Sequence, residues 1–453
     1  MWTLKNIDLA KPLYKAVLEA LERDIISGIL RPGDRLPTHR ALGKQVGVTL
    51  TTASRVYREA EKRGFVTAVV GRGTYVTADA GKKASVIDLR QEAPDWELGI
   101  VKPLPNTDPD LCPLARKILH KRRLPLLMSY SDPQGLPEHR AAGAQWISRF
   151  GLPVSPRDII ITAGAQHALF VICNSLFLPG DRIATDCLTY PGIKTAAQRN
   201  GLRLEGVPMD DAGMLPDDLE ILCNRHRIKA LYLSGRVQNP TNRMMPRARR
   251  IEIQGIIRRH ELLLIENDPY GFLSVNADSS ISSLVPEYSI YISSLSKAFL
   301  GGLRIAYVAA PEHLTANLTQ GIADNMLAVS PFCAEFAAEC IHTGLADSSI
   351  ALKRKAVLQR LSLFRKVFAD HVYACTDECM HAWLMLPPAW GGRRLESEAA
   401  RHKIRIYSSE KFAVGSTTSP EAVRISLTGI EDLGSLEAAL CSLERLVSRA
   451  AEA

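Results

Sequence analysis

Residues 289–310 read SIYISSLSKAFLGGLRIAYVAA, and this stretch determines the predicted fold. Two β-rich runs, SIYISS and LRIAYVAA, lie on either side of a Ser-x-x-Lys sequence that ends at Lys297, and Arg304 follows seven residues later. In open α/β sheets, ligands bind beyond the carboxyl ends of the strands. We therefore expect Lys297 and Arg304 to belong to a ligand site. A Ser-x-x-Lys sequence also occurs in penicillin-binding proteins, but no clear Ser-Asp-Asn or Lys-Thr-Gly partner accompanies it here.

The region around this stretch alternates short β-rich runs with helical segments from about residue 130 onward. This alternation is typical of the α/β class, with a mostly parallel sheet that is covered by helices on both faces. The expected strands are DIIITA (158–163), DRIATDC (181–187), LRLEGVPM (202–209), KALYLS (229–234), LLLIEND (262–268), SIYISS (289–294) and LRIAYVAA (303–310). We expect a large subdomain over about 130–320 and a smaller α+β subdomain over about 330–453.

Polar side chains follow several of these strands. Asp268 follows LLLIEN, Asn239 lies shortly after KALYLS, and Gly164 opens a helix after DIIITA. Pyridoxal 5′-phosphate (PLP) needs this combination: an amine for a Schiff base, an acid for the ring nitrogen, donors to the phenolate oxygen and an anion-binding helix start. The expected ligands are Lys297 for the Schiff base, Asp268 for the ring nitrogen, Asn239 and Tyr270 for the phenolate oxygen, Tyr190 against the ring, and Gly164, Ala165, Gln166, Ser294 and Arg304 for the phosphate.

Seven motifs extend the pattern over about residues 88–450: YSDPQGLPEHR, TAGAQHAL, TYPG, QNPTN, ENDPYG, SSLSKAFLGGLRIAY and AVRISL. Together they resemble the fold-type-I aminotransferases of classes I and II. The resemblance implies that Arg424 binds the α-carboxylate of an amino compound. It also implies that Tyr130 reaches the phosphate of the neighbouring subunit in a homodimer. The chain departs from the usual motifs at Asn242, where glycine is common, and at Gly301, where proline is common.

The first 78 residues are basic and helical. They carry 13 Lys and Arg against 7 Asp and Glu, a net of +6 out of +8 for the whole chain. Apolar spacing predicts helices over 12–27, 38–46 and 49–63, followed by two strands around a turn that contains Arg72. This order predicts a helix-turn-helix, and the hydroxyl-rich start of the third helix suits phosphates and base edges in a major groove.

The segment from about residue 11 to residue 77 resembles the winged helix-turn-helix of the GntR family. The resemblance is carried by the motifs PLYKAVLEAL, RPGDRLPTHRALGKQVGVT and GRGTYV. The DNA contacts that this resemblance implies are Arg40, Thr49, Thr51, Thr52 and the wing residue Arg72. Leu50 stands where many members have arginine, and a leucine there suits a thymine methyl group. Residues 78–86, ADAGKKASV, predict a linker between a DNA-binding domain at 1–77 and an aminotransferase-like, PLP-binding domain at 87–453.

A GntR-type head linked to an aminotransferase-like body is the architecture of the MocR family of bacterial transcription regulators. It implies a homodimer, commonly head-to-tail, whose heads bind operator DNA while the PLP pocket senses an amino compound or PLP itself. The alternative is a catalytically active aminotransferase with an accessory head. We favour the regulator, because a full DNA-binding head has no role in catalysis. A cofactor-storage protein would explain neither Arg424 nor the head.

The composition is that of a globular protein, with 46% hydrophobic and 23% charged residues. No apolar stretch reaches the roughly 18 residues of a membrane helix, and the N-terminus has no secretory pattern. We therefore expect a cytoplasmic protein with no membrane contact. Cys375, Cys379 and His381 form the one cluster of potential metal ligands, but no second ligand pair follows, so we expect reduced thiols and no metal site.

Overall fold

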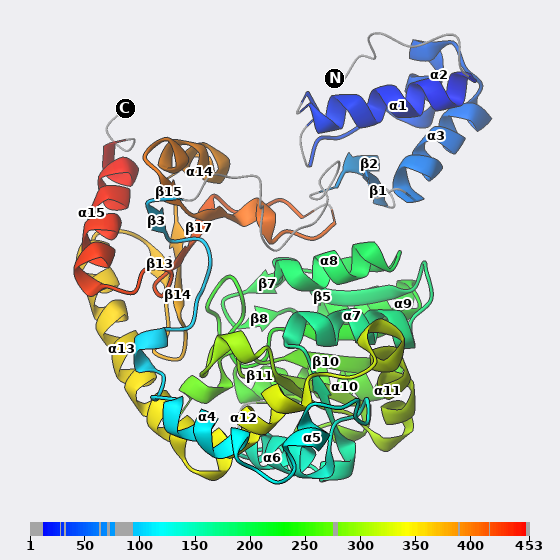
Figure 1. Cartoon of the computed structure of the whole chain (residues 1–453). Helices are drawn as coiled ribbons and strands as arrows, with labels where there is room; N and C mark the ends of the chain where they lie inside the picture. The colour runs from blue at the N-terminus through cyan, green and yellow to red at the C-terminus, as the bar shows by residue number, and fades with distance from the viewer. Residues whose placement is uncertain are drawn as a thin grey trace.

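The computed structural model describes residues 12–27, 29–30, 33–62, 65–69, 73–77, 94–274, 280–387, 390–415 and 417–449. Figure 1 shows a small N-terminal unit, which holds helices and a hairpin, and a larger body that holds the remaining sheets. The expected linker at 78–86 and the wing residue Arg72 lie outside the described residues. Within the described residues, no helix combines the length and the apolar character needed to cross a membrane.

The N-terminal unit has the predicted helix-turn-helix and hairpin. Its elements are α1 (Leu13–Ile26), α2 (His39–Val46), α3 (Leu50–Lys62) and the antiparallel strands β1 (Val66–Val69) and β2 (Gly73–Val76). The apolar faces meet in one core that includes Leu21, Leu42 and Val56. Thr38 caps α2 by accepting a 3.2 Å hydrogen bond from the backbone N–H of Ala41, and Gly47 ends α2 with φ 69°. Threonine and glycine suit these two cap positions, which explains why the boundaries of α2 follow from sequence.

The body is built on a seven-stranded sheet in the order β4-β12-β11-β10-β9-β5-β6. The strands are β4 (Ile159–Thr162), β5 (Arg182–Asp186), β6 (Arg203–Val207), β9 (Ile228–Leu233), β10 (Leu263–Asn267), β11 (Ser289–Ser294) and β12 (Ala306–Ala309). β12 is antiparallel to β4 and β11, and every other neighbouring pair is parallel. All seven predicted strands are therefore present, in a mostly parallel sheet. A short antiparallel pair, β7 (Met209–Asp210) and β8 (Gly213–Met214), follows β6.

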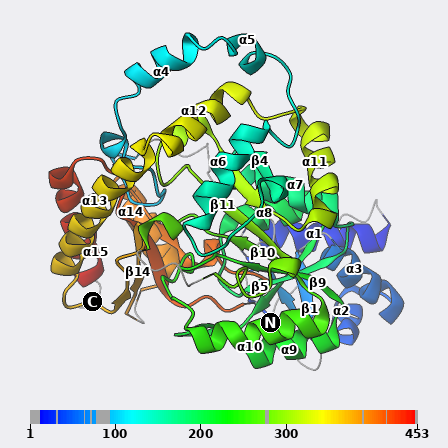
Figure 2. The same ribbon diagram turned by 90° about the horizontal axis from the view of Figure 1, so that it is seen from below.

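Helices cover both faces of this sheet (Figures 1 and 2). One face packs against α7 (Ala165–Leu176), α8 (Pro191–Arg199) and α11 (Glu312–Met326). On the other face, α9 (Pro216–Arg225) and α10 (Arg247–His260) cover β5, β9 and β10, while α6 (Pro137–Ser148) and α12 (Pro331–His342) cover β4, β11 and β12. The predicted α/β class is confirmed.

The C-terminal part forms a four-stranded antiparallel sheet in the order β13-β14-β17-β16. Its strands are β13 (Tyr373–Ala374), β14 (His381–Met385), β16 (Tyr407–Ser408) and β17 (Ala422–Ser426), and its helices are α13 (Leu345–Val367), α14 (Gly392–Arg401) and α15 (Leu433–Arg449). β3 (Trp96–Glu97) pairs in parallel with β15 (Ile404–Arg405). The first described residues after the linker are thus attached to the C-terminal part.

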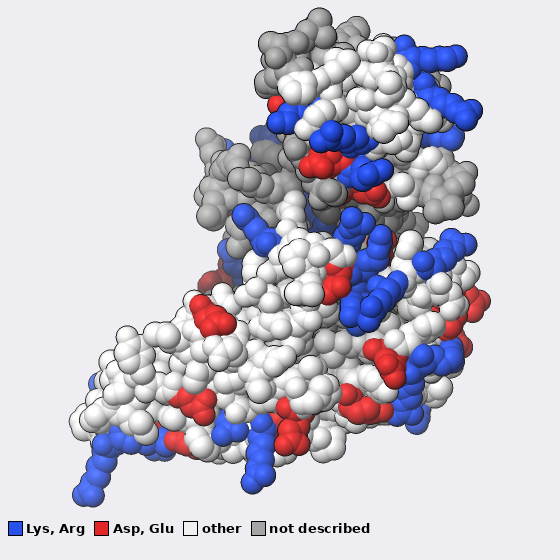
Figure 3. Space-filling model, turned by 90° about the vertical axis from the view of Figure 1, so that its right-hand side faces the viewer, with Lys and Arg blue, Asp and Glu red and all other residues white. Residues whose placement is uncertain are grey.

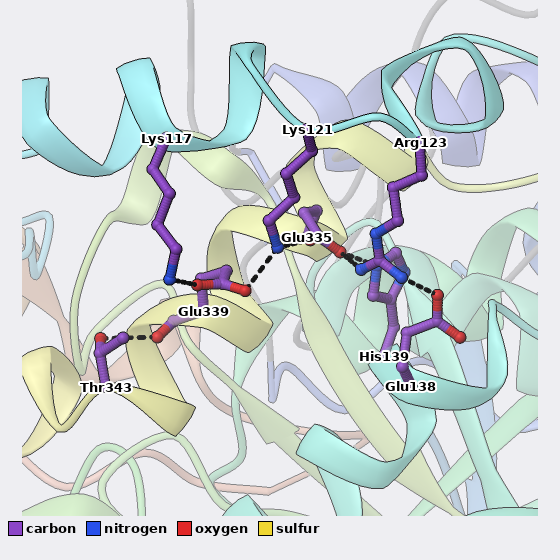
Figure 4. Close-up of polar contacts among 8 residues, drawn as sticks. All are labelled: Lys117, Lys121, Arg123, Glu138, His139, Glu335, Glu339 and Thr343. Carbon is purple, nitrogen blue, oxygen red and sulfur yellow. Dashed lines mark hydrogen bonds and ion pairs between the residues drawn. The ribbon is translucent and has the colours of Figure 1, made fainter.

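Two short helices, α4 (Cys112–Leu119) and α5 (Leu124–Leu127), lie along the outer side of α12 (Figure 2). An ionic network fastens them there (Figure 4). Glu335 on α12 is 1% exposed and accepts hydrogen bonds from Lys121 at 2.5 Å, from Nε2 of His139 at 2.7 Å, and from Arg123. Burial alone would raise the pKa of Glu335, but the hydrogen bonds from His139, Arg123 and Lys121 outweigh it and hold the pKa well below its usual range. The carboxylate is therefore a charged anchor for the α4–α5 segment.

Candidate functional site

A cavity of about 440 Å³ lies where the carboxyl ends of the central strands meet the C-terminal sheet. It gathers most of the predicted cofactor ligands from distant parts of the chain. The predicted residues that line it are Ala165, Gln166, Tyr190, Asn239, Tyr270, Ser294, Lys297, Arg304 and Arg424. The cavity is also lined by residues that the sequence analysis did not predict, namely Ile100, Val101, Ser234, Asn267, Pro269, Ser296 and Tyr407.

Lys297 presents its amine to this cavity, three residues after the end of β11. The amine donates a hydrogen bond to the carbonyl oxygen of Val101. Burial, together with the charges of Arg424 and Arg304, lowers the pKa of Lys297 to about 7. A large fraction of this amine is therefore neutral near pH 7, which is the form that attacks an aldehyde.

Asp268 lies directly after β10 and is buried. Its Oδ2 accepts a 2.8 Å hydrogen bond from the hydroxyl of Tyr291 and lies 3.5 Å from Nε of Arg236. Within the described residues, Oδ1 has no hydrogen-bond partner. Burial raises the pKa of Asp268, and the charge of Arg236 opposes that rise. A buried carboxylate oxygen without a partner is costly, so this site suits a cationic donor such as a protonated ring nitrogen.

The backbone beside Asp268 allows a close approach. Gly235 has φ 64°, and a Cβ there would lie 2.7 Å from the Cβ of Asp268. Gly271 would place a Cβ 2.5 Å from Oδ2 of the same residue. These two glycines explain how the carboxylate can lie so deep in the body.

The start of α7 and Arg304 form an anion cradle. Gly164 precedes the helix with φ 85°, and a Cβ there would lie 2.4 Å from Nη2 of Arg304, so only glycine fits. Arg304 also has a left-handed backbone, with φ 56°, and its Nη1 donates to Oγ of Ser296 at 2.6 Å. Ser294 ends β11 on the same cavity wall. A helix N-terminus, an arginine and two hydroxyls make a favourable site for a phosphate group.

Arg424 on β17 is the second cation of the cavity. Its Nη1 donates to Oδ1 of Asn239 at 2.9 Å, and its Nη2 donates to the carbonyl oxygen of Gly99 at 2.7 Å. The guanidinium carbon lies 4.9 Å from the ring centroid of Phe412. Burial lowers the pKa of Arg424, and within the described residues its Nε has no hydrogen-bond partner. The side chain is thus held at the cavity wall by two hydrogen bonds.

Three predicted residues need separate comment. Tyr190 lines the cavity, and its hydroxyl donates to Oε1 of Gln166 at 3.3 Å. Asn242, where glycine is common, has φ 61°, a conformation that asparagine tolerates better than most residues. Tyr130 does not line this cavity and is 88% exposed, so its predicted role requires a second chain.

These groups together fit pyridoxal 5′-phosphate. Lys297 offers the amine, Asp268 offers an unpartnered carboxylate oxygen, and the cradle around Arg304 suits the phosphate. Asn239 and Tyr270 lie on the cavity wall, where they can reach a phenolate oxygen. The cluster of Cys379 and His381 includes no third ligand: within the described residues, no group of three or more His, Cys, Asp or Glu side chains is placed to hold a metal ion.

A second candidate surface lies at the start of α3. Thr49, Leu50 and Thr51 are exposed there, as is Arg40 on α2. Thr52 is partly engaged with Thr49: its backbone N–H donates to Oγ1 of Thr49 at 3.2 Å, and the two hydroxyls lie 2.9 Å apart. Lys and Arg side chains project from the N-terminal unit at the top of Figure 3. α3 is the second helix of the helix-turn-helix, and its first residues are exposed with basic side chains nearby. Such a surface suits a DNA major groove.

Comparison with known proteins assigns a family to each of the two parts of the chain. Residues 106–438 match the family described as aminotransferase class I and II, and residues 13–76 match the bacterial regulatory proteins of the gntR family. The chain is 31% identical over 443 residues to the uncharacterized HTH-type transcriptional regulator YdeF of Bacillus subtilis, covering 98% of this chain and 96% of YdeF. It is 27% identical over 436 residues to the uncharacterized HTH-type transcriptional regulator YdcR of Escherichia coli, covering 90% of this chain and 93% of YdcR. An archaeal alanine:glyoxylate aminotransferase has the same fold, with a TM-score of 0.72, 23% identity, and coverage of 82% of this chain and 95% of that structure.

Proposed function

The chain belongs to the MocR group of GntR-type regulators within the aminotransferase class I and II family, and we propose that it senses an amino compound through its cofactor. It is a PLP-dependent, DNA-binding transcription regulator. Its N-terminal unit binds operator DNA, and its cavity holds PLP. When bound, PLP supplies an aldehyde that combines reversibly with primary amines. The site can therefore distinguish amino compounds from compounds that lack an amine.

Each side chain of the cavity has a proposed task. Lys297 bonds the cofactor, and Asp268 keeps the ring nitrogen protonated. Arg304 and the start of α7 hold the phosphate, Asn239 and Tyr270 donate to the phenolate oxygen, and Tyr190 packs on the ring. Arg424 binds the carboxylate of the effector. Arg304 thus fixes the phosphate end of the cofactor, and Arg424 fixes the carboxylate end of the effector.

One observation carries the regulatory part of the proposal: two basic side chains of the cavity donate hydrogen bonds to the segment that follows the linker. Arg424 donates to Gly99, and Lys297 donates to Val101. An effector that takes up Arg424 changes the partners of this segment, and the segment leads to the DNA-binding unit. An effector can shift DNA affinity only if the protein has two arrangements that differ in DNA affinity and the effector binds one of them more tightly than the other. We propose that the position of residues 98–101 distinguishes these arrangements.

We further propose a homodimer, in a head-to-tail arrangement, in which Tyr130 serves the neighbouring subunit. Exposed apolar side chains on and next to the α4–α5 segment, at Leu119, Leu126 and Met128, support this proposal. They lie close in sequence to Tyr130, so one contact area can bury them and deliver the tyrosine. Because operator DNA is the partner, we place the protein in the cytoplasm.

The experiment is DNA binding by the full-length protein with and without effector. Fluorescence anisotropy should show binding to DNA from upstream of the gene itself, with an affinity that falls with salt by a slope of about −0.9 per neutralised phosphate. Deletion of residues 1–78 should abolish binding and keep the cofactor spectrum. Among amino compounds, the effector should change affinity by roughly 5–150-fold. Turnover of an amino donor at about 1 per second or faster, with no effect on DNA binding, would contradict the proposal and favour an enzyme.

A further inference from the structure

The hydroxyl of Tyr270, a proposed donor to the cofactor, shares one buried acceptor with a thiol. Its oxygen lies 3.4 Å from Nδ1 of His381, and the sulfur of Cys379 lies 3.0 Å from the same nitrogen. His381 begins β14, and both His381 and Cys379 are fully buried. Since Tyr270 lines the cavity, the cluster connects the C-terminal sheet to the cofactor site.

The second nitrogen of His381 fixes the protonation of the ring. Nε2 lies 3.2 Å from the carbonyl oxygen of Pro240, which can only accept a hydrogen bond, so Nε2 carries a proton. Burial, followed by the charge of Arg424, holds the pKa of His381 well below its usual range, so the ring is neutral. A neutral ring that is protonated at Nε2 has a single acceptor lone pair at Nδ1.

Both neighbours of Nδ1 are donors. Burial raises the pKa of the Cys379 thiol to about 12, and burial also raises the pKa of Tyr270. Two protonated groups therefore compete for one lone pair. When the thiol donates to His381, the Tyr270 proton is available to the cavity. When Tyr270 donates to His381, it presents only its lone pairs to the cavity.

We propose that Cys379 and His381 are positioning residues that set how strongly Tyr270 donates to the phenolate oxygen of PLP. The thiol, by satisfying Nδ1, keeps the Tyr270 proton directed at the cofactor. A donor to the phenolate oxygen stabilises the cofactor after it has lost its own proton, because the oxygen then carries more negative charge. The cluster therefore sets the pH at which the cofactor loses that proton. This inference rests on the proposed function, because it requires PLP in the cavity.

The test is a pH titration of the visible absorption band of the PLP-loaded full-length protein. Cys379→Ala leaves Nδ1 to Tyr270, so the midpoint should rise by about 0.5–1 pH unit, the effect of one hydrogen bond. Cys379→Ser keeps a donor and should keep the wild-type midpoint. His381→Phe removes the acceptor, so its midpoint should stay at or below that of the wild type. The effect of Cys379→Ala should vanish when it is added to His381→Phe or to Tyr270→Phe.

The other titratable groups that line the cavity are the same in these variants, namely Lys297, Arg304, Arg424, Tyr190 and Tyr407. A loss of packing alone would shift Cys379→Ala and His381→Phe in the same direction, whereas the proposal requires that only Cys379→Ala raise the midpoint. Equal midpoints for wild type and Cys379→Ala, or equal rises in Cys379→Ala and Cys379→Ser, would overturn the positioning role. Wild-type protein that takes up no PLP would contradict the proposed function itself, and this inference with it.

Discussion

Arg424 donates from Nη2 to the carbonyl oxygen of Gly99 at 2.7 Å, although 325 positions separate the two residues in the chain. Arg424 belongs to the cofactor cavity, and Gly99 lies two residues after β3, in the first described stretch that follows the linker. The contact joins the side chain that is proposed to bind a carboxylate to the segment that leads to the DNA-binding unit. An effector at Arg424 therefore acts on a chain segment that is already part of the cavity wall.

Gly429 offers a direct test of this connection. A Cβ at Gly429 would lie 1.9 Å from the carbonyl oxygen of Glu97 and 3.1 Å from that of Ile100, so alanine there must displace the segment. We expect Gly429→Ala to retain PLP but to lose most of the effector-dependent change in DNA affinity, as measured by anisotropy. Gly434→Ala is the control, because its Cβ would meet no atom closer than 3.4 Å. The same effector response in both variants would argue against a role for the segment.

The rate of PLP uptake should depend on pH through Lys297. The amine must be neutral to attack the aldehyde, and burial with the charges of Arg424 and Arg304 lowers its pKa to about 7. Uptake by cofactor-free protein should therefore rise with pH through about 7 and level off above it, as followed by stopped-flow absorbance. Arg424→Gln removes one cation and should move the midpoint upward. A wild-type midpoint near 10.5, the ordinary lysine value, would show that the cavity does not perturb this amine.

Removal of the anchor at Glu335 should destabilise the α4–α5 segment. Glu335→Ala leaves the buried His139 without its acceptor and removes one of the two carboxylate partners of Lys121 and of Arg123. The loss of a partner by one buried polar group costs about 1–3 kcal/mol. Denaturant unfolding measures this cost. Glu287→Ala is the matched control: it breaks the exposed pair with Arg258 and should cost less than about 1 kcal/mol.

The same variant has a defined pH dependence. Because the pKa of Glu335 is lowered in the folded protein, its stabilising effect is present above the ordinary value of 4.5 and is lost as the pH falls through the folded-state value. The stability difference between wild type and Glu335→Ala should therefore shrink below about pH 4.5. A stability difference that stays constant as the pH is lowered to the point where the protein unfolds would show that packing, and not charge, holds the segment.

Leu50 should contribute to operator specificity. Its side chain is 51% exposed on the first residue of α3, where an apolar group can contact the methyl group of a thymine. With an operator selected from random DNA, replacement of the contacted thymine by uracil should weaken wild-type binding by about 4-fold, as for one methyl group. Leu50→Ala should be insensitive to that replacement. Leu352→Ala, which alters a leucine of similar exposure (57%) on α13, should behave as wild type.

The side chains of the cavity were largely predictable because they follow strands. Lys297 lies three residues after β11, and Asn239 and Tyr270 lie shortly after β9 and β10. These three strands are parallel, so their carboxyl ends meet at one edge of the sheet. The left-handed Asn242 shows that even a departure from the usual motif can keep the same backbone conformation.

Other parts of the site have no such signal. Gly99 and Val101 contribute carbonyl oxygens, which every residue has, so their contacts with Arg424 and Lys297 depend entirely on tertiary structure. The α4–α5 segment was not predicted for the same reason: Arg123 meets Glu335 across 212 positions of sequence. Nor could spacing show that Tyr270 would share a histidine with a cysteine.

The central claim, that Lys297 holds PLP in a DNA-binding regulator, is tested most directly by borohydride reduction of the purified, PLP-loaded protein, followed by mass spectrometry of its peptides. The account predicts one pyridoxyl phosphate group, on the peptide that contains Lys297, and no adduct in Lys297→Ala. An adduct on a different lysine, or none on a protein that still binds its operator and responds to amino compounds, would contradict it.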